Sequence, residues 1–236
     1  MRTAAILPVK SFPRAKQRLG QSVPDQLRLE LARAMVSDVL LALAQTASIE
    51  CTILVTRERS VADAARELGA VVVEDALEAG QSAAASLGVR HALEHGFERV
   101  LCVPGDCPAL DPAELDELLA GHASAGAASA EQAPPLVTII PDRHGSGTNG
   151  LLLCPPDAIE PSFGPDSCER HRGLALNAGI VAGLAPLSSL VLDIDTGSDL
   201  DVLRERLRGH HERAVRTRAV LGQPARTQII SIETPA

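Results

Sequence analysis

The chain has 236 residues, 45% of them hydrophobic, so it is long enough to bury a sizeable core in one large domain or two small ones. Its 22 basic and 30 acidic residues give a formal net charge of -8, which argues against a nucleic-acid surface built on bulk positive charge. Three Phe and no Trp or Tyr also disfavour a single-strand binder that stacks bases on aromatic side chains.

The five cysteines are scattered and odd in number, with no CxxC pair and no zinc-like spacing to a histidine. We expect reduced and mostly buried thiols, as in a cytoplasmic protein. The first residues do not resemble a signal peptide, and no apolar run approaches the length of a membrane span. The sequence therefore predicts a cytoplasmic protein with no membrane partner.

Short apolar runs alternate with longer helical patterns along the chain. The runs predict strands over residues 3–9, 51–56, 70–75, 99–104, 136–142, 150–155 and 190–195. After the first strand, a helix entered through Ser-Val-Pro-Asp carries an apolar stripe with a spacing of four, made of Leu27, Leu31, Met35, Val39 and Leu43. The later helical patterns span 60–70, 81–96 and 111–122, and two more helices begin near residues 166 and 197.

The alternation of strands and helices predicts an α/β fold with mostly parallel pairing and right-handed crossovers. The strands lack a period of two, which is typical of a sheet covered by helices on both faces. Residues 121–135 are small and Pro-rich, and we expect a flexible link within one domain. That domain spans residues 1–208, and the polar, stripe-free segment 209–236 is expected to be a peripheral tail.

One buried-strand pattern ends on a charge. Val100 to Val103 are apolar, and the chain then turns through Pro-Gly to Asp106. Asp is a common turn residue. The alternative is a metal ligand at the carboxyl end of a parallel sheet, where open α/β folds bind their ligands.

A glycine-rich segment, "GSGTNG" at 145–150, matches the GxGxxG pattern of dinucleotide-binding folds. The residues that follow, "LLLCPP", cannot open the helix that a pyrophosphate site needs, so we reject that interpretation. The segment reads as a turn between two strands. It is either a mobile hairpin or a loop whose free N–H groups hold an anion.

Basic residues gather in the connection that follows the first strand, among them Lys10, Lys16 and Arg18. They form either a solvated loop or a site for a triphosphate at the carboxyl edge of the sheet. A helix start after the Gly-Pro turn at 164–165, capped by Asp166 or Ser167, offers a further anion site.

A second acidic site lies in "LVLDIDTGSDLDVL", residues 190–203. Asp199 is explained as a residue in the first turn of a helix. Asp193 and Asp195 are two apart on the predicted strand, so they share one face and repel unless a cation lies between them. Carboxylates from separate strand ends are what Mg²⁺ usually takes from a protein, and Asp106 completes such a set. The histidines, such as His91 and His95, are most simply solvated.

Five segments, in order, resemble the phosphoenolpyruvate / 2-phospho-L-lactate guanylyltransferase family of coenzyme F-420 biosynthesis, a branch of the nucleotidyltransferase superfamily. They are "LPVKSFPRAKQRLG", "VPGDCPAL", "DRHGSGTNGLLL", "FGPDSCERH" and "LDIDTGSDLD". The resemblance covers residues 1 to about 208. It implies a Rossmann-like mixed sheet, GTP as nucleotide donor, Mg²⁺, and a small phosphorylated three-carbon acid as acceptor.

By this resemblance the acceptor contacts fall on Thr148, Gly164 and Ser167. The metal aspartates fall on Asp106 and on Asp193 or Asp195. Around residues 78–88, related enzymes usually read Gly-Leu-Asn-x-Ala, where this chain has Gln81 and Ser82 as its candidate nucleotide contacts.

The expected reaction is transfer of GMP from GTP to phosphoenolpyruvate, with release of pyrophosphate. Asp106 and Lys16 are expected to be catalytic, while Lys10, Lys16 and Arg18 neutralise the β- and γ-phosphates. Two alternatives stay open: 2-phospho-L-lactate as the acceptor, and a nucleotide-binding regulator of the same fold without turnover. We expect small-molecule partners and no nucleic acid, and the chain is compatible with a homodimer.

Overall fold

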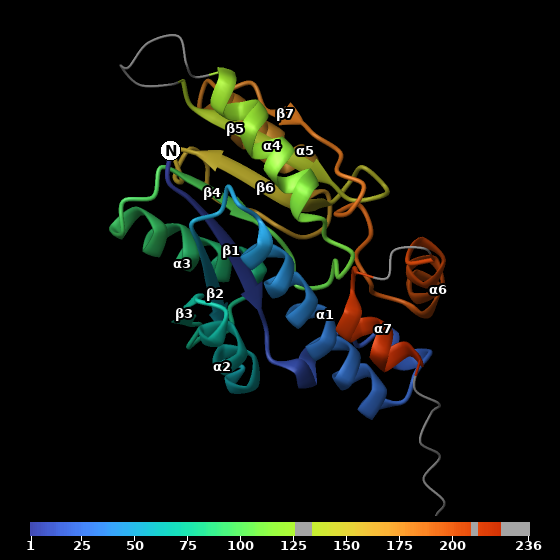
Figure 1. Cartoon of the computed structure of the whole chain (residues 1–236). Coiled ribbons are helices and arrows are strands. Elements are labelled where there is room, and N and C mark those ends of the chain that lie inside the picture. The colour runs from blue at the N-terminus through green and yellow to red at the C-terminus, as the bar shows by residue number, and fades with distance from the viewer. Residues whose placement is uncertain (126–133, 209–211, 223–236) are drawn as a thin grey trace, which may run out of the picture.

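Seven strands form one mixed sheet in a computed structural model that describes residues 1–125, 134–208 and 212–222 (Figure 1). Their order across the sheet is β3-β2-β1-β4-β6-β5-β7. Their bounds are β1 Thr3–Val9, β2 Cys51–Thr56, β3 Val71–Glu74, β4 Arg99–Cys102, β5 Leu136–Pro141, β6 Thr148–Cys154 and β7 Gly183–Leu184. The predicted α/β class with a mixed, mostly parallel sheet is confirmed.

The direction of the strands determines which residues can meet. β1 pairs in parallel with β2 on one side and with β4 on the other, so the chain leaves β1 at a switch in strand order. β6 runs antiparallel to both β4 and β5. The beginning of β6 therefore lies at the same edge of the sheet as the carboxyl ends of β1 and β4. This is where ligands bind in open α/β sheets.

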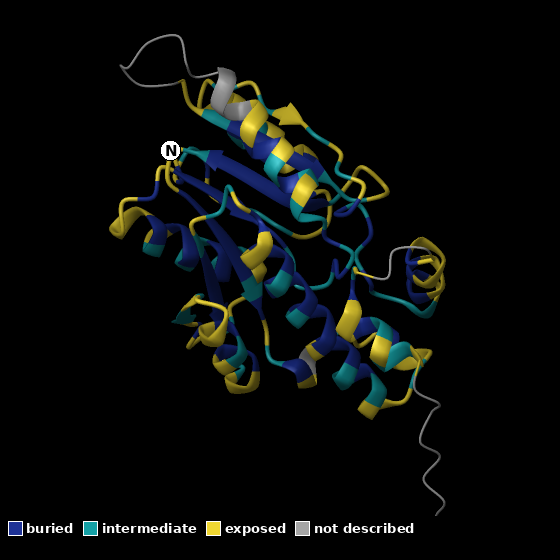
Figure 2. Cartoon of the chain, viewed as in Figure 1, coloured by how far each residue is buried: buried dark blue, intermediate teal, exposed yellow. Residues whose placement is uncertain are grey.

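Helices cover both faces of the sheet. On one face, α1 (Asp25–Gln45), α2 (Arg59–Glu67) and α4 (Pro112–Ala125) pack against side chains of the central strands. On the other face, α3 (Gln81–Glu94) and α5 (Ser167–Asn177) do the same. Figure 2 shows the central strands buried between these layers. Burial on both sides explains why the strand sequences are apolar without alternation.

The packing of α3 on β1 is close enough to require glycine. A Cβ at Gly88 would lie 2.4 Å from Cγ2 of Ile6, which is closer than any real carbon contact. The main chain of α3 thus sits directly on the strand that leads into the basic connection. That connection contains two short 3-10 helices, Phe12–Arg14 and Leu19–Gln21.

A third cluster of buried apolar residues lies beside the sheet, between α1, α6 (Gly197–Arg206) and the segment that precedes α6. The described part of the segment after Arg208 forms α7 (Val215–Gly222), which lies alongside α1 (Figure 1). The carboxylate of Asp38 on α1 accepts main-chain hydrogen bonds from Arg216 (3.0 Å) and Thr217 (2.8 Å). A buried side chain of α1 therefore caps the first turn of α7.

The prediction of a strand over residues 190–195 is wrong. The segment has no ladder partner in the described sheet and crosses its carboxyl edge as irregular backbone. Leu192 and Ile194 are buried while Asp193 and Asp195 are half-buried, so one-sided packing produces the alternation that suggested a strand. The short edge strand β7 was not predicted.

Other boundaries shift slightly. β6 begins at Thr148 rather than at residue 150, and the glycine-rich segment forms the predicted turn between two antiparallel strands, β5 and β6. In the predicted link 121–135, residues 121–125 belong to α4, and residues 126–133 lie outside the described part of the chain. None of the helices in the described ranges is both long and apolar enough to cross a membrane.

Candidate active site

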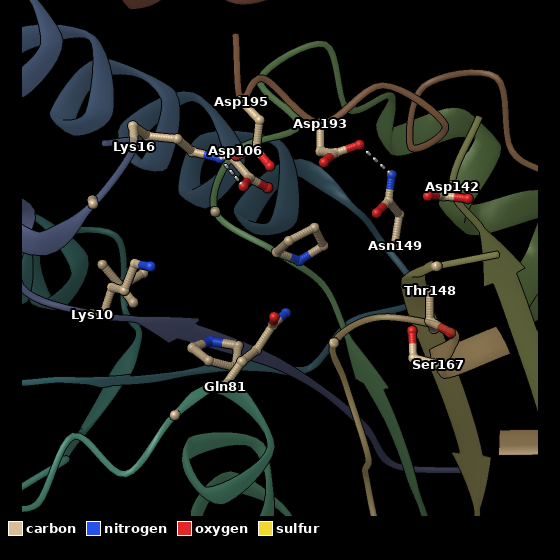
Figure 3. Close-up of a pocket in the computed structure, with 18 of the residues that line it drawn as sticks. Lys10, Lys16, Gln81, Asp106, Asp142, Thr148, Asn149, Ser167, Asp193 and Asp195 are labelled. Atoms are coloured by element: carbon tan, nitrogen blue, oxygen red, sulfur yellow. Dashed lines mark hydrogen bonds and ion pairs between the residues drawn. The ribbon is translucent and has the colours of Figure 1, made fainter. Parts of the chain in front are cut away.

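A cavity of about 670 Å³ opens at the carboxyl edge of the sheet, between the basic connection after β1, the β5–β6 turn, the start of α5 and the acidic segment before α6 (Figure 3). It brings together every predicted site residue except Ser82. Those lining it are Lys10, Lys16, Arg18, Gln81, Asp106, Thr148, Gly164, Ser167, Asp193 and Asp195. Residues spread over most of the chain therefore share one pocket.

One side of the cavity is acidic and is held together by Lys16. The Lys16 ammonium donates to the carboxylate of Asp106 and, at 2.7 Å, to Oδ1 of Asp195. Burial by itself would lower the pKa of Lys16, but the two carboxylates outweigh it and the pKa is raised. Lys16 is thus a permanent cation that contacts both acidic segments (Figure 3).

The carboxylates on this side exceed the positive charge that meets them. Asp106 and Asp195 share the Lys16 ammonium, and Arg18 reaches only the rim, 3.9 Å from Asp195. Asp193 lies beside them and contacts only the neutral amide of Asn149 among the described side chains. Burial raises the pKa of Asp193, and the neighbouring Asp106 raises it further. Such an excess of negative charge in a half-buried site favours binding of a cation.

The donor atoms on this side fit Mg²⁺. Oδ1 of Asp106 is buried and has no hydrogen-bond partner among the described residues. The available ligands are all carboxylate oxygens, which hard divalent cations prefer, and Mg²⁺ needs only one or two of them beside water and phosphate. Asp106 with Asp193 or Asp195 can supply that number, and a magnesium site here stays a prediction.

The loop that carries Lys16 is anchored from three directions. The buried guanidinium of Arg28 on α1 donates to the carbonyl oxygens of Phe12 and Ala15. Glu78 accepts from the main-chain N–H of Ser11 at 2.8 Å, and Glu58 accepts from that of Phe12 at 3.0 Å. Lys16 itself has a left-handed backbone, with φ of 55°. These anchors hold an unfavourable conformation that points the ammonium at the aspartates.

The acidic segment is anchored without a strand. Nδ2 of Asn149, at the start of β6, donates to the carbonyl oxygen of Leu190 at 2.7 Å and lies 3.4 Å from Oδ1 of Asp193. The main-chain N–H of Ile194 donates to the carbonyl oxygen of Asp106 at 3.1 Å. Sequence reasoning missed Asn149, although it lies in the quoted "GSGTNG" motif.

The far end of the acidic segment is fixed by the expected helix cap. Thr196 and Asp199 form a capping box at the start of α6, and Asp199 also accepts from the main-chain N–H of Asp195 at 3.0 Å. Its other oxygen pairs with Arg143 of the β5–β6 turn at 2.6 Å. Asp199 therefore links the acidic segment to the turn, beyond its predicted role as a residue in the first turn of the helix.

The opposite side of the cavity presents two uncharged hydroxyls, those of Thr148 and Ser167, and we call it the neutral side after them. Asp142, Arg143 and Asp166, from the same turn and helix start, also line the cavity. Oγ1 of Thr148 lies 3.0 Å from Nδ1 of His171 on α5, and Nε2 of the same ring accepts from the main-chain N–H of Ser162 at 2.9 Å. His171 is fully buried. The sequence analysis did not single it out, since a histidine in a helical stretch carries no distinguishing pattern.

The turn before α5 presents the remaining predicted acceptor contacts. Gly164 has φ of 118°, and Asp166 takes the N-cap position with φ of 55° and no side-chain cap bond. Ser167 is the first residue of the helix and is buried. Ser82 does not line the cavity; its hydroxyl accepts from the main-chain N–H of Phe163 at 2.8 Å. Its structural role is to hold this turn against α3.

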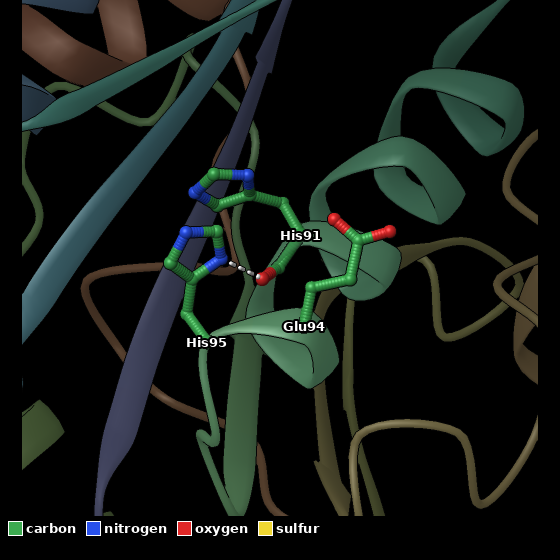
Figure 4. A group of neighbouring side chains, drawn as sticks. All are labelled: His91, Glu94 and His95. Carbon is green, nitrogen blue, oxygen red and sulfur yellow. Dashed lines mark hydrogen bonds between the residues drawn. The ribbon is translucent and has the colours of Figure 1, made fainter.

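A separate group of metal-ligating side chains lies on α3. His91, Glu94 and His95 have ligand atoms within 4.8 Å of one another, which no other set of three achieves in the described ranges (Figure 4). The two imidazoles stack with their ring centroids 4.0 Å apart, and Nδ1 of His95 forms a hydrogen bond with the carbonyl oxygen of His91. None of the three lines the cavity, so this group is distinct from the site.

Comparison with known proteins places this geometry in context. The family model described as "Guanylyl transferase CofC like" matches residues 3–216. A phosphoenolpyruvate guanylyltransferase of Conexibacter woesei is 46% identical over 227 residues, covering 96% of this chain and 98% of the relative.

Two solved structures share the fold. One from Desulfovibrio desulfuricans G20, described as a nucleotide-diphospho-sugar transferase, has a TM-score of 0.70 at 18% identity, with 94% of each chain covered. A nucleotidyl transferase from Methanothermobacter thermautotroptrophicus has a TM-score of 0.61 at 20% identity, covering 89% of this chain and 99% of that one.

Proposed function

We propose that this chain, which belongs to the CofC-like guanylyl transferase family, transfers GMP from GTP to phosphoenolpyruvate and releases pyrophosphate, as a step of coenzyme F-420 biosynthesis. The observation that carries the proposal is the cavity itself. Its acidic side carries more negative charge than its neighbours neutralise and so favours a bound cation. Its neutral side presents hydroxyl and main-chain hydrogen-bond donors, and both lie at the edge of a nucleotidyltransferase fold. The acidic side suits a nucleoside triphosphate with its metal, and the neutral side suits a small anionic acceptor.

In the proposed reaction, a phosphate oxygen of phosphoenolpyruvate attacks the α-phosphorus of GTP in line. A new P–O bond forms, the bond between the α-phosphorus and the bridging oxygen breaks, and pyrophosphate leaves with that electron pair. The nucleophile is already an anion, so no proton need be removed and no covalent enzyme intermediate is needed. Catalysis then consists of positioning two polyanions and neutralising their charge.

The residues on the acidic side would perform the neutralisation. Lys16, fixed by its anchored loop, would move its ammonium between the aspartates and the phosphates, while Lys10 and Arg18 lie at the rim for the β- and γ-phosphates. Asp106 with Asp193 or Asp195 would hold Mg²⁺. When bound, Mg²⁺ supplies charge neutralisation and polarises the α-phosphate.

The residues on the neutral side would bind the acceptor. The hydroxyls of Thr148 and Ser167, with the main chain after Gly164, face the cavity from β6 and from the start of α5. Hydroxyl and N–H donors at a helix start suit a carboxylate or phosphate. Gln81, at the start of α3, lies near Lys10, across the cavity from the aspartates (Figure 3), and would contact the nucleotide. The five cysteines form no disulfide, which agrees with the cytoplasmic location that we propose.

The direct test is an assay of pyrophosphate release from the purified protein with Mg²⁺, GTP and phosphoenolpyruvate. We expect turnover that depends on all three components and is lower when ATP replaces GTP. Equal rates with the two nucleotides would refute the guanine preference, which stands on family membership. No turnover with either acceptor would favour the regulator alternative.

A competition assay with phosphoenolpyruvate and 2-phospho-L-lactate at equal concentration identifies the preferred acceptor. The two share a carboxylate and a phosphate, and they differ in a planar methylene against a tetrahedral methyl. A pocket that senses only this apolar difference gives about 10- to 200-fold discrimination. We expect the phosphoenolpyruvate product to dominate. A pool dominated by the lactyl product would change the acceptor and leave the guanylyl transfer intact.

A further inference from the structure

We infer that His171 is a positioning residue for the acceptor, because its imidazole donates to Thr148 Oγ1 and so leaves the Thr148 hydroxyl hydrogen free for an anionic oxygen in the cavity. The inference rests on the proposed function, since it is that function that assigns the acceptor to Thr148. His171 itself is fully buried and is not one of the residues that line the cavity. It acts through Thr148.

The tautomer follows from the partner of the other ring nitrogen. The main-chain N–H of Ser162, 2.9 Å from Nε2, can only donate. Nε2 must therefore carry a lone pair, and in the neutral ring the hydrogen is on Nδ1. Nδ1–H then donates to Oγ1 of Thr148 across 3.0 Å.

This direction determines what Thr148 can do. With one lone pair of Oγ1 engaged by His171, the hydroxyl hydrogen cannot point at the ring and is available elsewhere. Thr148 lines the cavity from the first position of β6. A hydroxyl that receives one hydrogen bond and donates another is better ordered than a free rotor and is a stronger donor. The acceptor of the reaction supplies the anionic oxygen that such a donor binds.

The surroundings keep His171 neutral. Burial lowers its pKa, and the charge of the adjacent Arg170 lowers it further, to about 4. The groups that face the ring from the neighbouring turn and from β6 are Ser162, Phe163 and Thr148, which carry no charge. A second proton would also place an N–H against the N–H of Ser162. The ring therefore holds the same tautomer through the working range of pH.

His171 also ties together the two pieces of the acceptor site. Its contact with Ser162 fixes the turn that leads to Gly164 and Ser167, and its contact with Thr148 fixes β6. The same turn is braced by Arg170, whose guanidinium donates to the carbonyl oxygen of Pro165 at 2.8 Å. The imidazole thus sets the spacing between the hydroxyl of Thr148 and the start of α5.

Two substitutions separate the two ring contacts. In His171→Asn the amide can place an N–H near the position of Nδ1, so the donation to Thr148 is kept. In His171→Gln the longer side chain can place its carbonyl near Nε2, so the bond from Ser162 is kept and the donation to Thr148 is lost. We expect the Gln variant to raise KM for the acceptor about tenfold, the cost of one hydrogen bond to a charged group, with KM for GTP unchanged. The Asn variant should stay within about threefold of the wild type.

The double variant shows whether the effect runs through Thr148. In a Thr148→Val background, His171→Gln should raise the acceptor KM by less than about twofold, since the hydroxyl it orients is gone. An equal rise in both backgrounds, or no rise in folded His171→Gln, would overturn the inference. Circular dichroism shows whether each variant is folded.

A readout without turnover separates this inference from the proposed function. Long-range ¹⁵N–¹H NMR of the wild-type protein, assigned with His171→Asn, reports the tautomer directly. We expect Nδ1–H with no titration between pH 5.5 and 8. An Nε2–H tautomer, or titration near the ordinary histidine pKa, would overturn the inference even in an active enzyme. An inactive enzyme with the Nδ1–H tautomer would overturn the proposed function instead, and with it the role of the acceptor.

Discussion

The two sides of the cavity are built in opposite ways. On the acidic side, Asp106 and Asp195 come from irregular backbone, and their charge is only partly met by Lys16. On the neutral side, Thr148 and Ser167 begin a strand and a helix, and the Ser162–His171–Thr148 contacts are complete without a ligand. The acidic side therefore has electrostatic free energy to gain from its ligands, whereas the neutral side offers geometry that is already set.

Because of this difference, we expect the two sides to affect different kinetic constants. Substitutions on the acidic side should lower kcat, because charge develops on the phosphates in the transition state. Substitutions on the neutral side should raise the acceptor KM and leave kcat nearly unchanged, because they alter binding that the ground state already has. Substitutions on each side of the cavity test this division.

Asp106→Asn should have the largest effect. It keeps the shape of the side chain but removes the charge from the carboxylate in the turn after β4, so kcat should fall by about 10³-fold or more. Pyrophosphate release measures the loss, and thermal unfolding checks the fold. Asp201→Asn is the matched control, since Asp201 is an exposed residue of α6 that pairs with the nearby Arg204 at 2.7 Å and does not line the cavity. A large loss of stability with Asp106→Asn would point to a structural role instead.

Lys16→Met should lower kcat by about 100-fold, because it removes the fixed cation that contacts both acidic segments. It should also make Tm depend more strongly on Mg²⁺ than in the wild type, since the aspartates are then left without their ammonium. Thermal unfolding with and without millimolar Mg²⁺ measures this. Arg18→Met is the comparison. Arg18 is exposed and comes no closer than 3.9 Å to Asp195, so its loss should lower kcat less than the loss of Lys16. Equal effects of the two variants would contradict a special role for Lys16.

The layers of the fold could be predicted because burial and strand patterns are local. The error at 190–195 has a physical cause: Leu192 and Ile194 alternate with Asp193 and Asp195 as in a strand, but the segment forms no ladder. Its carbonyl oxygen at Leu190 accepts from the Asn149 side chain, and its N–H at Ile194 donates to the carbonyl oxygen of Asp106. Alternation of apolar and polar residues indicates that one side of a segment is buried. It does not show that the segment pairs with another strand. Which main-chain groups a segment meets depends on distant parts of the chain.

The two sides of the cavity also differ in how far they could be predicted from the sequence. The clustering of the aspartates could be predicted, since a carboxylate shortly after a buried apolar run is costly without a partner and therefore conspicuous in the sequence. The strand expected to carry Asp193 and Asp195 is not formed. On the neutral side, the acceptor role of Thr148 was expected from family resemblance, whereas Ser167 was expected both from that resemblance and from the helix start after the Gly-Pro turn. His171 and Asn149 were missed, because a neutral polar residue in the core needs only one well-placed N–H or carbonyl group, and no sequence pattern shows where that group lies.

Asn149→Ala tests a side chain of β6 that holds the acidic segment against the other side of the cavity. It removes the bond to the carbonyl oxygen of Leu190 and the contact with Asp193, which should lower the free energy of unfolding by about 1–2 kcal/mol. The acidic segment should also bind Mg²⁺ more weakly, as followed by the Mg²⁺ concentration that gives half-maximal turnover. Asn177→Ala, at the exposed end of α5, is the matched control and should change neither. An unchanged Mg²⁺ dependence would mean that the acidic segment holds its position without β6.

The smallest effect concerns the pH dependence of stability on the neutral side. His171 has a pKa of about 4 in the folded chain against an ordinary value of 6.5, so the unfolded chain binds its proton first as the pH falls. Stability is therefore unaffected by this group above pH 6.5 and is lost as the pH falls from 6.5 towards 4. Between pH 7 and 5.5 this should cost about 1 kcal/mol of the free energy of unfolding.

Urea unfolding of wild type and His171→Asn at these two pH values isolates the contribution, because Asn does not titrate. We expect the variant to lose about 1 kcal/mol less than the wild type on acidification. Asn177→Ala provides the control, since this exposed position of α5 carries no titratable group in either form and should leave the pH dependence as it is in the wild type. If His171→Asn and wild type lost stability equally, the ring would accept a proton in the folded chain. The neutral side would then be as sensitive to charge as the acidic side, and the contrast between them would fail.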